Sequence, residues 1–298
     1  MTSVITRSKP AVKQEEKPQF TSSSRWDRIS SSSCAKPTVI LALLWLAIIA
    51  VWALAPGLVT SGDPISGNVA EKLLPPSGEH WFGTDQLGRD IFTRVVYGTG
   101  LTVKAVLVAV GLGFAVGGVL GAVAGFIGGW VDALFMRIAD VLLSIPSLLL
   151  SLAVIVALGF GTVNVAIAVG IGAVASIARV MRAEVLKVRN NLYVEAAYAA
   201  GATKWRVLWR HVLPNSLGPV IVLVVLEFGS AVLAISSLSF LGYGAPPPQP
   251  EWGALVAQGR DYLAAQGWIS TIPGLVITLT VLSVNRLSNA LNKNGGAR

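Results

Sequence analysis

The chain has 298 residues, of which 53% are hydrophobic and only 13% are charged, and its mean hydropathy is +0.67. Soluble domains carry about 25% charged residues, so this composition excludes an ordinary soluble domain and indicates that membrane lipid surrounds most of the chain. The net charge of +8 does not indicate nucleic-acid binding, because basic residues of membrane proteins gather on cytoplasmic loops and set the orientation.

The first 36 residues are polar and contain seven Lys or Arg residues, and we predict a disordered cytoplasmic tail at 1–36. The apolar run at 37–58 is predicted to be a first transmembrane helix. A cleaved signal peptide is less favoured, because the preceding polar region is unusually long.

Little in the sequence suggests catalysis. Cys34 is the only cysteine and there are two histidines, which excludes a disulfide within the chain. Neither a zinc-protease motif nor a phosphate-binding loop occurs. We therefore expect no catalytic residue, no metal site and no cofactor on this chain.

Six segments are apolar enough to cross a bilayer, which takes about 20 residues in a helix. These segments are 37–58, 101–128, 131–158, 163–186, 217–241 and 268–287. We predict an all-α integral membrane protein with six transmembrane helices, an external loop at 59–100, a core of five helices at 101–291 and a cytoplasmic tail at 292–298.

The charges between these segments set the orientation. The loop 59–100 has more acidic than basic residues, and 242–267 has a single arginine, whereas 187–216 is rich in Lys and Arg. The positive-inside rule places both termini and 187–216 in the cytoplasm and the other two loops outside.

Small residues recur along the second segment with a spacing of four, at Gly113, Gly117, Gly121 and Gly125. This spacing puts them on one helix face, which predicts close packing against another helix. The partner helix is not predictable from the spacing. In the third and sixth segments, Pro146 and Pro273 are expected to kink the helix or begin a new turn.

Ionisable residues inside membrane segments are costly and often functional. Glu227 lies about ten residues into the fifth segment. It either lines a polar pathway or is a hydrogen-bonded packing residue, and the sequence slightly favours packing. Arg137 and Asp140 are three residues apart, which predicts a local ion pair on one helix face.

The segment 190–215 is polar and basic, and includes the sequence EAAYAAGATKWRVLWRHVLPN. Its alanine-rich first part favours a helix, Gly201 favours a left-handed helix end and Thr203 favours the start of a second short helix. Three uses fit this segment: a lipid-lying amphipathic helix, a nucleic-acid site and a docking element for a cytoplasmic partner. The glycine break favours docking, since a lipid-lying helix gains from continuity.

This segment resembles the EAA loop of bacterial ABC importer permeases, in Glu195-Ala196-Ala197, in Gly201 and in Leu213-Pro214. His211 departs from the general pattern, which prefers isoleucine. Three further stretches resemble the C-type permease of the dipeptide, oligopeptide and nickel importers. They are HWFGTDQLGRDIFTRVVYG at 80–98, MRIADVLLSIPSLLL at 136–150 and SLSFLGYGAPPPQPEWGALV at 237–256.

The resemblance implies the type I ABC importer permease fold in a bacterial cytoplasmic membrane. It implies a homologous second permease subunit, two cytoplasmic ATP-binding subunits that hold ATP and Mg²⁺, and an external solute-binding protein. The outer segments 75–98 and 242–262 would dock this binding protein or shape the outer gate. The residues that it assigns to ATPase coupling are Glu195, Ala196, Ala197, Ala200, Gly201, Leu213 and Pro214.

Two alternatives stay open at this point. One is a secondary transporter or channel that works without ATP, although no repeat of the first three segments is evident in the last three. The other is an integral-membrane enzyme, for which no cluster of catalytic residues is found. The sequence does not identify the transported solute.

Overall fold

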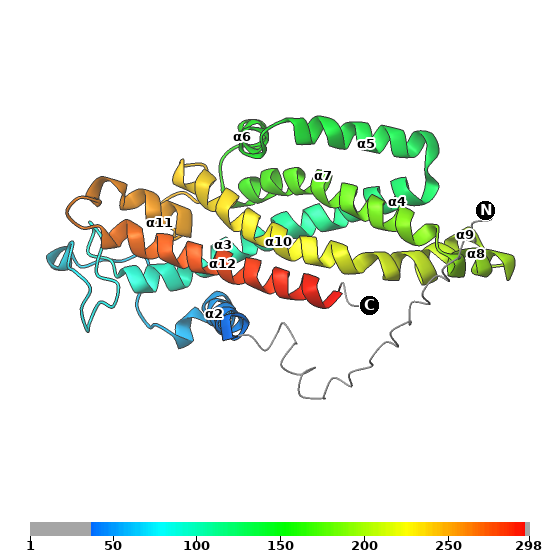
Figure 1. The fold of residues 1–298 in the computed structure, drawn as a ribbon. Helices are drawn as coiled ribbons and strands as arrows, with labels where there is room; N and C mark the ends of the chain where they lie inside the picture. The colour runs from blue at the N-terminus through cyan, green and yellow to red at the C-terminus, as the bar shows by residue number, and fades with distance from the viewer. Residues whose placement is uncertain (1–36, 296–298) are drawn as a thin grey trace, which may run out of the picture.

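The computed structural model describes residues 37–295, so the predicted N-terminal tail and Cys34 lie outside the described residues. This part of the chain is helical, and its β-structure is limited to an isolated bridge between Thr84 and Asp90. The helices form an elongated bundle with α11 at one end and the short α8 and α9 at the other (Figure 1).

The α-helices differ in length from 4 to 28 residues. They are α2 (Pro37–Leu54), α3 (Ile91–Leu112), α4 (Gly118–Ile127), α5 (Gly129–Ser144), α6 (Ser147–Leu158), α7 (Thr162–Arg189), α8 (Leu192–Ala199), α9 (Lys204–Val207), α10 (Leu213–Phe240), α11 (Trp252–Gln258) and α12 (Trp268–Gly295). Segments of π-helix at Gly113–Gly117 and Leu208–Val212 join α3 to α4 and α9 to α10, which makes two continuous helices of 37 residues each.

Within residues 37–295, five helices are long and apolar enough to cross a membrane, and α5 with α6 makes a sixth crossing if they count as one bent span. The prediction of an all-α protein with six spans is confirmed on that count. The first crossing is shorter than expected, since α2 ends at Leu54. The last is longer, since α12 continues to Gly295 and includes residues expected in a tail.

The third span is not a straight helix, because α5 and α6 meet at an angle of 97°. Ile145 has extended backbone angles (φ −91°, ψ 129°), as expected for a residue before proline. Pro146 then precedes the first turn of α6. Pro273, by contrast, lies inside the continuous helix α12.

The four glycines Gly113, Gly117, Gly121 and Gly125, here called the glycine seam, face α7. A methyl group added to Gly117 would lie 2.5 Å from the carbonyl oxygen of Val174, and one on Gly125 would lie 2.8 Å from that of Arg182. The seam therefore lets the backbones of the α3–α4 helix and α7 approach closely, which gives dispersion contacts that larger side chains would prevent.

Helix α5 is attached to α7 by ion pairs. Asp132 accepts two hydrogen bonds from the guanidinium of Arg182, and Asp140 lies 2.6 Å from Nη2 of Arg179. The predicted pair of Arg137 with Asp140 is wrong, because the carboxylate of Asp140 faces the neighbouring helix and bonds Arg179 there.

At the α11 end, the segment between α2 and α3 folds onto the bundle through a buried polar network. The guanidinium of Arg89 binds Asp85 with Nε 2.7 Å from Oδ2. Arg89 and Arg94 both donate to Oε1 of Gln258 on α11, at 3.3 and 3.2 Å. The indole of the fully buried Trp252 donates to the carbonyl of Val95 at 3.2 Å, so α11 is held against α3.

Candidate functional site

Residues 190–215, the segment predicted to couple to an ATPase and here called the coupling segment, consist of two short helices joined by a glycine turn. Helix α8 ends with Ala202 N–H donating to Ala197 O (3.0 Å) and Gly201 N–H donating to Tyr198 O (2.9 Å). This pair of bonds is the Schellman arrangement, which needs a left-handed residue, and Gly201 has φ +84°. The hydroxyl of Thr203 then accepts from Arg206 N–H and caps α9.

Apolar side chains fix this segment to the end of α7. Val194 of α8 and Val207 of α9 are fully buried, and they pack with Val185 and Val188 of α7. The two short helices therefore cannot turn independently of α7. Leu213 packs on the edge of this cluster, whereas Pro214 is exposed at the start of α10.

The remaining surface of the segment is largely exposed and carries both small and aromatic side chains, with Ala197 half-buried against the apolar cluster. Ala197, Ala200 and Gly201 line one groove of about 590 Å³, together with the basic side chains Arg206 and Arg210. Glu195 lines a second hollow on another side, of about 370 Å³, beside Arg189 and Lys204. Ala196 is exposed. Of the residues predicted to couple, four therefore line these two hollows, whereas Ala196, Leu213 and Pro214 line neither.

Arg189 has a structural role that the sequence did not indicate. Its Nη1 donates to the carbonyl oxygens of Gly125 (3.2 Å) and Phe126 (2.8 Å), close to the C-terminal end of α4. The last carbonyls of a helix have no partner within it and favour a cation. The pair Gly128-Gly129, both at positive φ, predicts from the sequence that α4 ends there. A helix end predicted at this point would have indicated free carbonyl groups that an arginine could bind.

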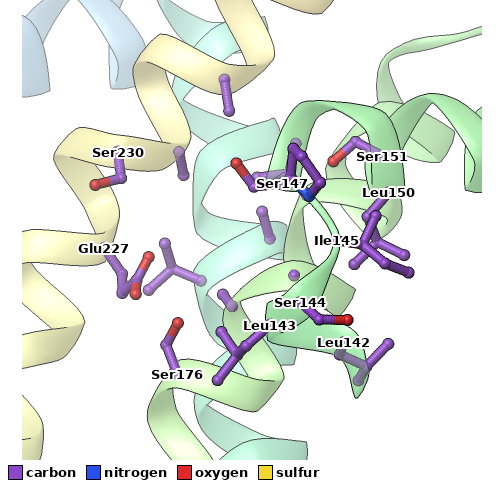
Figure 2. A pocket seen from close by; sticks show the side chains of 18 residues that line it. Leu142, Leu143, Ser144, Ile145, Ser147, Leu150, Ser151, Ser176, Glu227 and Ser230 are labelled. Carbon is purple, nitrogen blue, oxygen red and sulfur yellow. The ribbon is translucent and has the colours of Figure 1, made fainter. Parts of the chain in front are cut away.

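A cavity of about 540 Å³ lies between the α5–α6 break, α3, α7 and α10, and its α5–α6 wall is largely exposed. Glu227 points into it from α10, and the hydroxyl of Ser176 on α7 lies on the same side of the cavity (Figure 2). Ser230 follows one turn along α10, and Ser144 and Ser147 flank the break. The glutamate noted in the sequence therefore lines a cavity of mixed apolar and serine side chains, one wall of which is the break at Pro146.

The turn after α10 contains a fully buried carboxylate, Glu251, which the sequence did not single out. It accepts hydrogen bonds from the hydroxyl of Ser239 and, at 2.9 Å, from Ala245 N–H. Burial raises the pKa of Glu251 above its ordinary value of 4.5, and these two hydrogen bonds oppose the rise. The carboxyl group holds the 242–251 turn onto the end of α10.

The sequence matches a family described as binding-protein-dependent transport system inner membrane component over residues 117–294. The chain is 40% identical over 254 residues to the probable D,D-dipeptide transport system permease protein DdpC of Escherichia coli K12, covering 85% of each chain. It is 38% identical over 273 residues to the dipeptide transport system permease protein DppC of Alkalihalophilus pseudofirmus, covering 92% of this chain and 90% of that protein.

A third relative is the glutathione transport system permease protein GsiD of Pectobacterium atrosepticum, 41% identical over 72% of each chain. Among solved structures, the fold resembles a chain of the inward-facing MetNI methionine ABC transporter, with a TM-score of 0.53 and 20% identity over 66% of this chain and 96% of that one. It also resembles a chain of an amino acid ABC transporter with histidines, with a TM-score of 0.55 and 15% identity over 68% of this chain and 94% of that one. These two likenesses concern the fold alone.

Proposed function

The chain belongs to the family of binding-protein-dependent transport system inner membrane components, and from this premise we propose that it carries small peptides or related solutes across the membrane at the expense of ATP. It is a multi-pass permease subunit of an ABC importer. Membership in this family implies partnership with ATPase subunits and with another permease subunit.

The observation that carries the coupling role is the rigid attachment of the coupling segment. Its inner face is buried against α7 and it continues through Leu208–Val212 into α10, while its outer face is exposed. A push on the exposed alanine and glycine surface would therefore reach two long helices at once. A short helix that lies in a partner's groove is a common mode of recognition.

We place ATP and Mg²⁺ on two cytoplasmic ATP-binding subunits that dock on this surface, and expect none of them on this chain. A homologous permease would complete the translocation pathway. An external solute-binding protein would dock on the segments 75–98 and 242–262 at the α11 end of the bundle. This end lies opposite the end that carries α8 and α9 (Figure 1).

The proposed location is a bacterial cytoplasmic membrane, with both termini and the coupling segment inside. Ser77, Asn191 and Gln249 are exposed positions for cysteine labelling in a Cys34→Ser background. Cysteines at Ser77 and Gln249 should react with an impermeant maleimide in intact cells, and one at Asn191 only after permeabilisation. Labelling of position 191 in intact cells would contradict this orientation.

The peptide assignment is supported by the names of the relatives, which specify D,D-dipeptides, dipeptides and glutathione. The test is uptake of radiolabelled di- and tripeptides into proteoliposomes containing the complete transporter and its binding protein. Uptake should require ATP and stop when the ATPase subunits are replaced by hydrolysis-deficient variants. Uptake that continues without ATP would instead indicate a secondary transporter.

A further inference from the structure

The cavity at the α5–α6 break has one ionisable side chain, which indicates the kind of group that would bind there. Its lining includes apolar side chains, five serines and a single ionisable residue, Glu227. Cavities of about 300–1,000 Å³ accommodate small ligands, and this one, of about 540 Å³, is large enough for a short peptide.

Glu227 is half-buried and faces the cavity. Within residues 37–295 it forms no ion pair, whereas Asp85, Asp132 and Asp140 each bond an arginine. A carboxylate removed from bulk water without a cation is unfavourable. A bound cation in the cavity would supply the missing partner.

The neighbouring groups favour an ammonium as this cation. An ammonium has three N–H donors and no acceptor. Glu227 offers carboxylate oxygens, and the hydroxyls of Ser176 and Ser230 offer further acceptors on the same side of the cavity (Figure 2). Hydrogen bonds between an ammonium and a carboxylate are among the stronger ones in proteins.

The rest of the cavity is suited to side chains of varied size. Leu142, Leu143, Ile145 and Leu150 form an apolar wall from the α5–α6 break. Such a wall does not strongly distinguish one apolar side chain from another, since a methylene changes binding by only about 1–3 kcal/mol. The charged end of the solute is therefore the part that this cavity recognises specifically.

We propose that Glu227, with Ser176 and Ser230, binds the protonated amino terminus of a peptide during its passage through the permease. This inference rests on the proposed function. A single carboxylate attracts the ammonium without holding it permanently, as conduction requires binding that is strong enough for entry and weak enough for release.

The cation site is tested independently of any solute by cysteine labelling. Cys34→Ser/Ser147→Cys places one thiol on the wall across from Glu227. Its rate of reaction with a cationic methanethiosulfonate, relative to an anionic one of similar size, should fall about fivefold or more when Glu227→Gln is added. The matched control Glu184→Gln, on α7 outside the cavity lining, should leave the ratio unchanged. A ratio that Glu227→Gln does not change would overturn the proposal.

The peptide part is tested in the reconstituted transporter, with the peptide that the wild type takes up fastest. Glu227→Gln should reduce its uptake about tenfold or more, and Glu227→Asp should retain a larger share. For the N-acetylated form of the same peptide, which lacks the ammonium, Glu227→Gln should change uptake by less than about twofold. Equal losses for both peptides, or no loss, would overturn the proposal. A wild-type complex that takes up no peptide would contradict the proposed function, whereas the labelling ratio tests the cation site itself.

Discussion

Arg182 on α7 donates two hydrogen bonds to the carboxylate of Asp132 on α5, one of them 2.6 Å from Nη2 to Oδ2. Both oxygens of the carboxylate are engaged by one planar guanidinium, the geometry that arginine supplies and lysine does not. This pair joins the first turns of α5 to the second half of α7, and so fixes one end of the helix whose other end is the α5–α6 break.

Loss of this pair should loosen α5. Asp132→Asn is expected to lower the stability of the purified complex by about 1 kcal/mol, because a bidentate, partly buried pair contributes more than an exposed one. Thermal unfolding in detergent measures the change. The control is Asp140→Asn, whose pair with Arg179 is more than half exposed. Equal decreases in the two variants would show that the bidentate geometry at Asp132 adds nothing.

The glycine seam should not tolerate a single methyl group. Gly117→Ala would place its Cβ 2.5 Å from Val174 O, so α7 must shift, and overpacking of this kind costs about 1–3 kcal/mol. Gly111→Ala is the matched control on the same continuous helix, since nothing lies within 4 Å of its added Cβ. A lower unfolding temperature is expected for Gly117→Ala only. An unchanged unfolding temperature for that variant would mean that α3–α4 and α7 are not in close contact.

Gly201 should be needed for coupling because of its backbone conformation and not because of crowding. An added Cβ would meet nothing within 4 Å, but φ is +84°, where a β-branched residue is strained by roughly 1–2 kcal/mol. Gly201→Val should leave the subunit in the membrane and reduce ATPase activity stimulated by the loaded binding protein. Gly201→Asn is the control, because asparagine tolerates this region better. Full stimulation with Gly201→Val would exclude the segment as the coupling element.

Glu251 should make stability depend on pH. Burial raises its pKa in the folded protein, so the folded state favours the protonated carboxyl. The stabilisation is complete below the unfolded value near 4.5 and is lost as the pH rises through the higher folded value. As the pH rises from the unfolded pKa to the folded pKa of Glu251, the unfolding temperature should fall for the wild type and fall less for Glu251→Gln. The exposed Glu79→Gln serves as control, and a wild-type slope retained by Glu251→Gln would contradict the assignment.

The sequence was informative where a local rule decides the structure. The positive φ at Gly201 and the start of α9 at Thr203 follow from helix-end chemistry, and the spacing of the glycine seam determines which residues share a face. The partner of that seam, α7, depends on tertiary packing and had no local signal.

Competition between local and distant partners explains why the predicted pair of Arg137 with Asp140 was wrong. The spacing of Arg137 and Asp140 is compatible with a pair, but it does not exclude a better partner, and Arg179 is 39 residues away in the sequence. The cavity at Glu227 was also unpredictable in this sense. It requires the 97° break at Pro146, whereas a proline in an apolar run is equally compatible with a mild kink.

The continuous helix from Lys204 to Phe240 has a mechanical consequence. Its 37 residues extend over about 55 Å at 1.5 Å per residue. It begins in the coupling segment, contains Glu227 about two thirds of the way along, and has Ser239, which binds Glu251, in its last turn. If it moves as one lever arm, a tilt of about 5° at one end displaces the other end by about 5 Å. The coupling segment, Glu227 and Ser239 would then move together, because all three lie on the same helix. The cavity wall and the 242–251 turn would change position in one movement, without a chain of side-chain rearrangements between them.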